Sequence, residues 1–189
     1  MRTQNFIRNV NGVEVPAPGR WRIPNSHVTV TYAARTGFVR RVRARAPEAS
    51  GAFDIADDLG SASFELSVGA SASPHARDVP SLGAMLGDEH LDRLVLRASA
   101  IEPTTDGPWR ARGEVEFDGV SRQSPVIITY HGVYKAGDGA KAWLTVHAGI
   151  LQDISGPRRR RPIELVADVL AIGPSRLQSH DPGRFSAVA

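Results

Sequence analysis

The stretch GRWRIPNSHVTVTYAART, residues 19–36, places a histidine among hydroxyl side chains. His27 stands beside Ser26 and shares the parity of Thr29 and Thr31 in the alternating run that follows. An imidazole serves as a general acid or base, or binds a metal ion, and both kinds of chemistry need suitable partners. None of these hydroxyl groups is a good metal ligand alone. We therefore expect His27 to form local hydrogen bonds or to meet a ligand near the mouth of the fold.

A second group of titratable residues lies in and beside an irregular segment between residues 70 and 90, where the alternating pattern breaks. Its members are His75, Asp78, Asp88, Glu89, His90 and Asp92. Their spacing matches no zinc motif such as HExxH. Polar residues are expected in a solvated loop that caps a short helix, and this interpretation accounts for all of them. The sequence therefore predicts no metal site.

Arginines form the strongest charged features of the chain. One group is Arg35, Arg40, Arg41, Arg43 and Arg45, and the other is the run from Arg158 to Arg161. A solvated strand face and a solvated turn explain both. The alternative is a rim that holds a phosphate or carboxylate headgroup, because arginine pairs bidentately with such oxygens. Arg41, Arg43 and His27 are then the headgroup candidates, and a weak attraction to an anionic membrane surface is a further alternative.

Composition limits the classes of function. The chain has 189 residues, no cysteine and a formal net charge of +3. The sequence contains no phosphate-binding glycine loop, no GxSxG motif and no paired carboxylates that mark a cleft, so we predict a protein that is not an enzyme and has no cofactor. Aromatic residues do not interleave with the arginines, which argues against nucleic acid. The absence of cysteine and of an apolar leader favours a cytoplasmic location.

Short alternating runs separated by Gly, Pro, Asp and Asn predict an antiparallel sheet that closes on itself. The cleanest strand is residues 109–117, and Asp118-Gly119 predicts a hairpin turn after it. About two turns of helix are expected within residues 76–90, with Asp78 as N-cap and Gly87 as the stop. We predict a mainly β, lipocalin-like barrel of about eight strands and one short helix. It occupies residues 19–172, between an N-terminal extension (1–18) and a flexible tail (173–189).

The run SPVIITYHGVY, residues 124–134, is apolar on both faces around Ile127 and Ile128. A strand that buries both faces needs a second covering layer. A partner subunit could supply that layer, so we expect a homodimer.

The order of these segments resembles the YceI-like family of bacterial polyisoprenoid-binding proteins. Residues 21–32, WRIPNSHVTVTY, follow that family's opening pattern W-x-hydrophobic-D-x-x-H-(S/T)-x-hydrophobic-x-F, except at Pro24 and Tyr32. Gly51-Ala52-Phe53 matches a G-x-F element, and Arg77-Asp78 with Leu82 resembles R-D-x-x-L. LDRLVLRASAIEP and RARGEVEFDGVSRQSPVIITY resemble two later strands of the family. The resemblance implies a divergent member whose barrel encloses one extended apolar chain and has no catalytic group.

Alternation then selects the inward residues that would line the lumen. They are Trp21, Val28, Val30, Tyr32, Phe53, Phe64, Leu66, Leu94, Leu96, Trp109, Val115, Phe117, Ile128 and Trp143. We expect a carrier for a hydrophobic small molecule, isoprenoid or fatty-acid-like. The alternative is a packed barrel that acts as a homodimeric interaction module. An enzyme for an apolar substrate, with His27 or His131 as acid–base, is a third hypothesis.

Overall fold

The computed structural model describes residues 6–36, 40–58, 61–71, 80–105, 107–137, 139–151 and 162–174. Within these ranges the chain forms strands, one 3-10 helix and one α-helix. In chain order they are β1 (Ile7–Val10), β2 (Val13–Pro16), β3 (Gly19–Ile23), η1 (Asn25–His27), β4 (Val28–Thr36), β5 (Arg40–Arg45), β6 (Ala49–Ile55), β7 (Ser63–Gly69), α1 (Leu82–Leu86), β8 (Arg93–Glu102), β9 (Trp109–Phe117), β10 (Val120–Ala136), β11 (Gly139–Leu151) and β12 (Pro162–Ile172).

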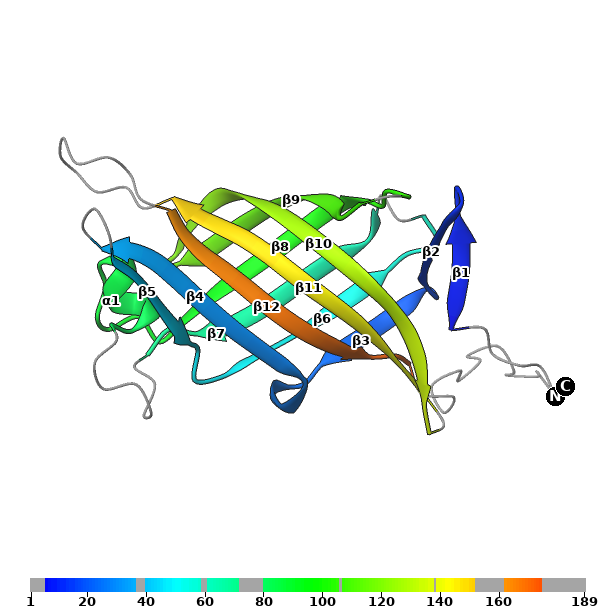
Figure 1. The fold of residues 1–189 in the computed structure, drawn as a ribbon, viewed down its shortest axis with the longest axis horizontal. Helices are drawn as coiled ribbons and strands as arrows, with labels where there is room; N and C mark the ends of the chain where they lie inside the picture. Colours follow the sequence, from blue (N-terminus) through cyan, green and yellow to red (C-terminus); the bar gives the residue numbers. More distant parts are fainter. Residues whose placement is uncertain are drawn as a thin grey trace, which may run out of the picture.

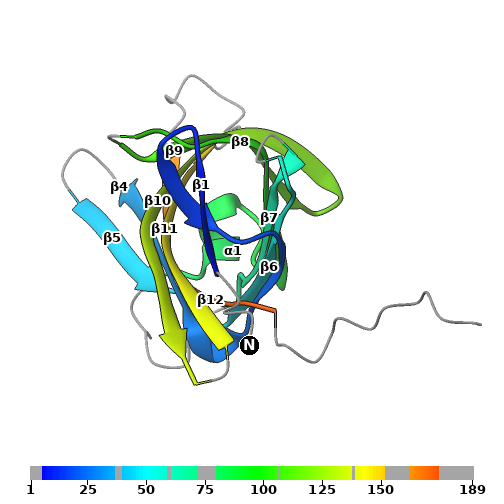
Figure 2. The same cartoon turned by 90° about the vertical axis from the view of Figure 1, so that its right-hand side faces the viewer.

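The main sheet closes into an antiparallel barrel. Its strands follow one another in the order β3, β6, β7, β8, β9, β10, β11 and β12, and β12 pairs with β3 to complete the ring. Figure 1 shows the strands running obliquely along the barrel, and Figure 2 looks down it from one end. The prediction of a mainly β chain, with an antiparallel barrel of about eight strands and one short helix, is confirmed.

Proline interrupts the first strand of the barrel. Pro24 has no backbone N–H to give to a ladder, and the chain makes one 3-10 turn, η1, before it resumes as β4. On one side, β12 pairs with β3 through Ile172 and Arg22, and with β4 through residues 164–169. On the other side, β6 pairs with β3 and β5 pairs with β4. Because of this break, β3 and β4 have different partners on this side: β6 beside β3, and β5 beside β4.

The short helix has well-formed caps. The Ser81 hydroxyl accepts a hydrogen bond of 3.0 Å from the backbone N–H of Ala84, and Gly87 ends the helix with a φ of 91°. The predicted stop at Gly87 is confirmed. The predicted N-cap is wrong, because α1 begins at Leu82 and its cap is Ser81, while Asp78 lies outside the described residues. The helix is also shorter than predicted.

The β9–β10 connection is the hairpin turn that the sequence predicts. Phe117 pairs with Val120, so the loop contains only Asp118 and Gly119. Both have positive φ, 49° and 69°, as a type I′ turn requires. This turn fixes the register of β9 against β10, and with it the side of the barrel to which each residue points.

The N-terminal residues fold against one end of the barrel. β1 and β2 form a hairpin beside the end of the ring, as Figure 2 shows. Val15 is fully buried, and the Arg8 guanidinium donates hydrogen bonds to the carbonyls of Ala56 and Asp57 after β6. At the other end of the chain, the Gly173 N–H donates to the Ala140 carbonyl at 2.8 Å. Residues 175–189 and the arginines at 158–161 lie outside the described residues.

No helix among the described residues has the length and apolar character that crossing a membrane requires.

Candidate functional site

The barrel interior is the compartment in which the sequence predicts ligand binding. The predicted lumen residues Trp21, Val28, Val30, Tyr32, Phe53, Phe64, Leu66, Leu94, Leu96, Trp109, Val115 and Ile128 are all buried there, and Phe117 is partly buried. Their inward direction follows from strict alternation along each strand. Contact with a ligand stays a prediction for this set.

Trp143 is the exception, and its assignment to the lumen is wrong. Its side chain is 47% exposed on the outer wall, whereas its neighbours Ala142 and Leu144 are fully buried. Successive residues of a strand face opposite sides, so Ala142 and Leu144 cannot both point inward if Trp143 does. The Trp143 ring instead packs against the His131 ring, with the two centroids 4.3 Å apart.

The interior is filled by the protein's own side chains. A cavity wide enough for a hydrocarbon chain would leave accessible surface on the residues that line it. Trp21, Phe53, Phe64 and Leu66 have at most 1% exposure, and the Phe53 and Phe64 rings pack edge to face. Eight-stranded barrels are just wide enough for their side chains or one small ligand, and this one is packed with side chains.

Small side chains occupy several inward positions of the barrel. Inward positions on β11 and β12 include Ala140, Ala142, Ala148, Ala167 and Ala171. Close approach is also visible at Gly173, where a Cβ atom would stand 2.9 Å from Cζ3 of Trp21. Among the described residues, the one buried polar side chain is Ser124, whose hydroxyl donates to the Gly149 carbonyl at 2.9 Å. The compartment is therefore dense and almost wholly apolar.

One end of this compartment is closed by the β1–β2 hairpin. Under it the Tyr130 and Trp109 rings are stacked with centroids 4.9 Å apart. Burial, with a smaller contribution from the Glu14 charge, raises the pKa of the Tyr130 phenol. Its hydroxyl oxygen is buried without a hydrogen-bond partner among the described residues. The Arg8 bonds hold this hairpin to the barrel.

The opposite end is closed by α1. Leu82 is fully buried, whereas Met85 and Leu86 are only partly buried. The Tyr32 hydroxyl donates a 3.2 Å hydrogen bond to the Pro80 carbonyl, and the Gly83 N–H donates to the Ala70 carbonyl at 2.9 Å. Burial raises the pKa of Tyr32. One buried leucine and a few hydrogen bonds thus fix a five-residue closure.

The predicted headgroup residues do not come together. His27 lies in η1, where Lys141 Nζ is 3.0 Å from its Nε2 and Ser26 Oγ is 2.9 Å from its Nδ1. Because an ammonium group only donates, Nε2 is the acceptor and Nδ1 carries the proton. Arg43 pairs with Ala33, which is six residues beyond His27 in the chain. At the usual rise per strand residue, about 20 Å separates His27 from Ala33. The Arg41 side chain lies outside the described residues.

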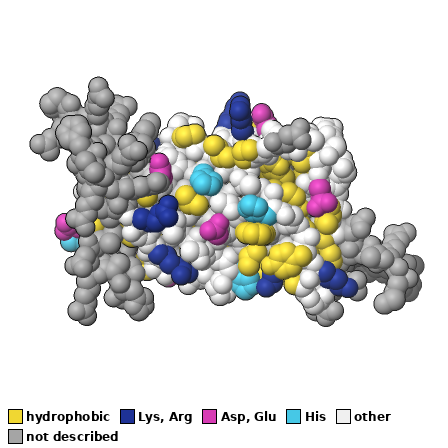
Figure 3. All heavy atoms as spheres, in the orientation of Figure 1, with side chains coloured by type: hydrophobic (Ala, Val, Ile, Leu, Met, Phe, Trp, Pro, Cys, Tyr) yellow, Lys and Arg dark blue, Asp and Glu magenta, His cyan; other side chains and the backbone are white. Residues whose placement is uncertain are grey.

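The outer wall of β10, β11 and β12 carries apolar and imidazole side chains, visible together in Figure 3. Ile127, Tyr134 and Trp143 are each more than 40% exposed, and no other part of the described chain covers them. Ile128 points inward, so the expected two-sided strand is correct, but the covering layer is not part of the described chain. Any partner subunit stays a prediction.

A hydrogen-bond chain crosses the same wall. The Thr145 hydroxyl donates to Asp168 Oδ1 at 2.9 Å, and His131 Nε2 lies 2.9 Å from the Thr145 oxygen. A hydroxyl has one proton to donate, so His131 must be the donor to Thr145. The imidazole is therefore not placed as a base for this hydroxyl, and the trio is not arranged as a nucleophilic triad.

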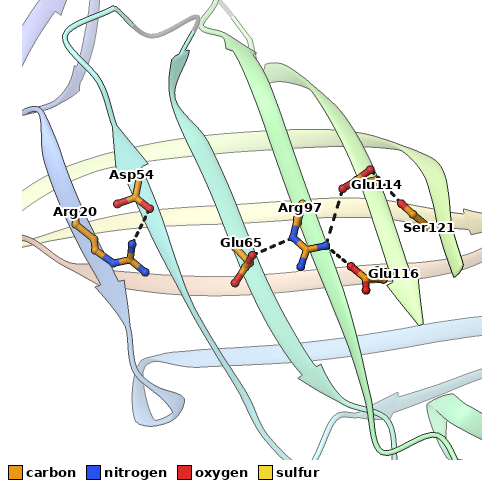
Figure 4. A network of polar contacts seen from close by, with 7 residues as sticks. All are labelled: Arg20, Asp54, Glu65, Arg97, Glu114, Glu116 and Ser121. Atoms are coloured by element: carbon orange, nitrogen blue, oxygen red, sulfur yellow. Dashed lines mark hydrogen bonds and ion pairs between the residues drawn. The ribbon is translucent and has the colours of Figure 1, made fainter. Parts of the chain in front are cut away.

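Charged residues line up across the outer wall on the far side of the ring. Arg22, Ala52, Glu65, Arg97, Glu114 and Gln123 are successive cross-strand neighbours on β3, β6, β7, β8, β9 and β10. Arg97 contacts Glu65 at 3.0 Å and also Glu114 and Glu116, as Figure 4 shows. In the adjoining row, Arg20 contacts Asp54 at 3.2 Å. We call the first of these rows the charged row.

Two open grooves follow the charged row. One, of about 430 Å³, includes Arg97, Arg112 and Glu114. The other, of about 570 Å³, includes Arg20, Arg22, Ser50, Ser67 and Ile172. Glu65 borders both grooves. Within the described chain, no three His, Asp or Glu side chains gather closely enough to hold a metal ion.

No protein-family model and no curated protein matches this sequence. Its resemblance to the YceI-like family therefore stays a prediction. Among solved structures it is similar to the crystal structure of Burkholderia cenocepacia BcnA, at 12% identity and a TM-score of 0.47, over 78% of this chain and 96% of that one. At this TM-score the likeness says nothing about function.

Sequence reasoning missed the charged row and its grooves. Alternation within one strand marks its outward residues as solvated but does not show which residues of other strands lie beside them. The alternation of signs becomes visible only when the register sets Arg22, Glu65, Arg97 and Glu114 side by side. The signal in the sequence is that the charge of the outward residues changes sign from one strand to the next, which indicates ion pairs between neighbouring strands.

Proposed function

We propose that this chain is a non-catalytic binding protein for a long apolar ligand, which enters the barrel interior where α1 closes it. The observation that supports the proposal is an almost wholly apolar compartment that is closed at one end by the five residues of α1. Among described residues, the interior offers a ligand almost no polar group, so it favours hydrocarbon chains such as isoprenoid or fatty-acyl groups over polar metabolites.

A ligand must displace α1 to enter, and because the interior is filled, the inward side chains must also repack to admit it. Releasing the buried Leu82 costs about 1.5–3 kcal/mol, and each lost hydrogen bond adds about 1 kcal/mol. Loss of translational and rotational freedom costs at least about 4 kcal/mol more. Burial of one methylene contributes about 0.8 kcal/mol, so roughly ten methylenes balance these costs. The ligand is therefore a chain of more than about ten carbons.

The residues nearest this closure are the ones that would receive the chain. Tyr32 contacts the segment that leads into α1. Met85 and Leu86 on the helix are partly exposed, so they offer a first apolar contact. One end of the ligand chain would take the place of Leu82 among these groups, and the rest would lie among the repacked side chains of the interior.

The test is uptake of a fluorescent long-chain fatty-acid probe by the purified full-length protein. Leu82→Ala weakens the closure, so we expect it to speed probe uptake several-fold. The matched control is Leu144→Ala, which removes an equally buried leucine from the wall between β10 and β12. Equal uptake rates in the two variants, or no saturable uptake by the native protein, would contradict the proposal.

A second candidate function is an interaction module with a permanently packed barrel. The observation that favours it is the filled interior together with the exposed Ile127, Tyr134 and Trp143 on the outer wall. Trp and Tyr are the residues that most often anchor protein interfaces. A homodimer through this wall predicts that light scattering gives twice the chain mass, and that Trp143→Ala returns the protein to monomers. A monomer at all concentrations would remove this candidate.

A further inference from the structure

The charged row is compensated along most of its length and uncompensated at one end. Glu65, Arg97 and Glu114 alternate in sign, and Arg97 contacts both glutamates. At the next position toward β3 the row has Ala52, which pairs with both Glu65 and Arg22. A methyl group stands where a carboxylate would neutralise Arg22. Within the described residues Arg22 forms no ion pair, and its side chain is exposed.

Ala52 also lies in the wall of a groove. Arg22, Ser50, Ala52 and Ser67 all border the 570 Å³ groove, with Pro24 and Ile172 among its apolar residues. Ser50 pairs with Ser67, so two hydroxyl groups lie side by side next to the gap. The Ser67 hydroxyl oxygen is buried and has no hydrogen-bond partner among the described residues. A buried hydroxyl without a partner is costly, and a bound acceptor removes that cost.

The charges around the groove favour an anion. Arg20 is neutralised by Asp54 at 3.2 Å, and Glu65, the acidic residue of the groove, is held by Arg97 at 3.0 Å. Arg22 is left as the uncompensated cation. Beyond Ile172, the next strand carries Lys141, whose described partner is the uncharged nitrogen acceptor of His27. Two strand spacings, about 10 Å, separate Lys141 from Arg22, so both contribute positive potential to one region.

We propose that this groove binds the phosphate group of an organic phosphate. The Arg22 guanidinium would pair with two phosphate oxygens, and the Ser50 hydroxyl would donate to the third, joined by the Ser67 hydroxyl once its side chain rotates into the groove. A carboxylate that pairs with Arg22 through both oxygens has no third oxygen for these hydroxyls. The groove is larger than a phosphate ion, so the organic part of the ligand lies against Pro24 and Ile172. This site is on the outer wall and is independent of the ligand proposed for the interior.

Inorganic phosphate is the probe for the first test. Titration of the full-length protein at low ionic strength should shift the NMR amide signals of residues 50–52 and 65–67 saturably. Arg22→Gln should weaken phosphate binding at least about ten-fold, since it removes a charge-assisted pair. The matched control is Arg112→Gln, which removes the same charge from the neighbouring groove and should change the affinity by less than about three-fold. Ser67→Ala should weaken binding several-fold.

The source of the phosphate group decides the second test. Vesicles of phosphatidylcholine with and without phosphatidic acid present the same group at a membrane surface. Arg22-dependent binding to the phosphatidic acid vesicles would identify a lipid headgroup, and Arg22-dependent binding of glycerol phosphate would identify a soluble ester. Each outcome supports the site. Equal losses in Arg22→Gln and Arg112→Gln, or no saturable binding of inorganic phosphate, would overturn it.

Discussion

The hydroxyl of Tyr32 donates a 3.2 Å hydrogen bond to the carbonyl of Pro80, and this bond joins the barrel wall to the closure formed by α1. Tyr32 projects inward from β4 and is 1% exposed, so the bond reaches from within the core to the segment that precedes the helix. The closure is thereby anchored by the Tyr32 hydroxyl, by the buried Leu82 and by the hydrogen bond from the Gly83 N–H to the Ala70 carbonyl.

Replacing Tyr32 with Phe tests this anchor. The ring stays in the core, and the lost hydrogen bond should lower the free energy of unfolding by about 1 kcal/mol. Because the bond is local, amide hydrogen exchange should accelerate at α1 more than in β11. Equal acceleration in both elements would show that Tyr32 stabilises the whole barrel rather than its closure.

Tyr130 makes a prediction about alkaline pH. Its pKa is raised in the folded protein, mainly by burial, above the unperturbed value of 10.0. The folded state therefore holds the phenol proton more tightly than the unfolded state does. Its contribution to stability is fully present below pH 10 and is lost as the pH rises from 10 toward the folded-state pKa.

Tyr130→Phe should accordingly flatten the loss of stability above pH 10 in urea denaturation. At neutral pH it should leave stability unchanged or slightly raised, because the phenol oxygen has no hydrogen-bond partner among the described residues. A large loss at neutral pH would mean that the hydroxyl has a partner after all.

The two tryptophans on opposite sides of the wall should respond very differently to truncation. Trp109 is 2% exposed and Trp143 is 47% exposed. Trp109→Ala should cost about 3–5 kcal/mol of stability, as other large-to-small core substitutions do. Trp143→Ala should cost less than about 1 kcal/mol. Thermal unfolding of both variants measures the difference, and similar losses would place Trp143 in a buried setting.

Gly113 should not tolerate a side chain. A Cβ atom there would lie 2.2 Å from Cγ2 of Val126 and 2.6 Å from the Ser124 carbonyl oxygen. Overpacking of this kind costs about 1–3 kcal/mol, so Gly113→Ala should lower the melting temperature. Gly139→Ala is the matched control, because its nearest contact would be 4.0 Å away. Equal melting temperatures would show that the β9–β10 pair adjusts freely.

Strand alternation predicted most of the barrel correctly, because each strand has one consistently apolar face. Residues 109–117 are the clearest case, since Trp109 and Val115 are buried while Arg110 and Arg112 are exposed. The prediction for Trp143 was wrong because it followed the size of the tryptophan side chain and not the alternation with Ala142 and Leu144. The pattern itself placed those two residues inside.

Features that depend on the pairing of strands could not be predicted from single segments. The sequence grouped His27 with Arg43, but the β4–β5 register separates them along the barrel. The registers of β3 with β6 and of β6 with β7 likewise bring Arg22, Ser50 and Ser67 together in one groove. Whether a barrel of eight strands is packed or hollow also depends on how its inward side chains fit together, such as the Phe53 and Phe64 rings, which pack edge to face.

Native mass spectrometry of the freshly purified full-length protein shows whether the barrel binds an apolar chain. The spectra would be recorded before and after addition of saturated fatty acids of eight and eighteen carbons. The balance of about ten methylenes predicts that the eighteen-carbon acid forms a one-to-one complex and the eight-carbon acid does not. If the protein never gains the mass of a co-purified or added apolar molecule, whatever the length of that molecule, the barrel does not bind an apolar chain.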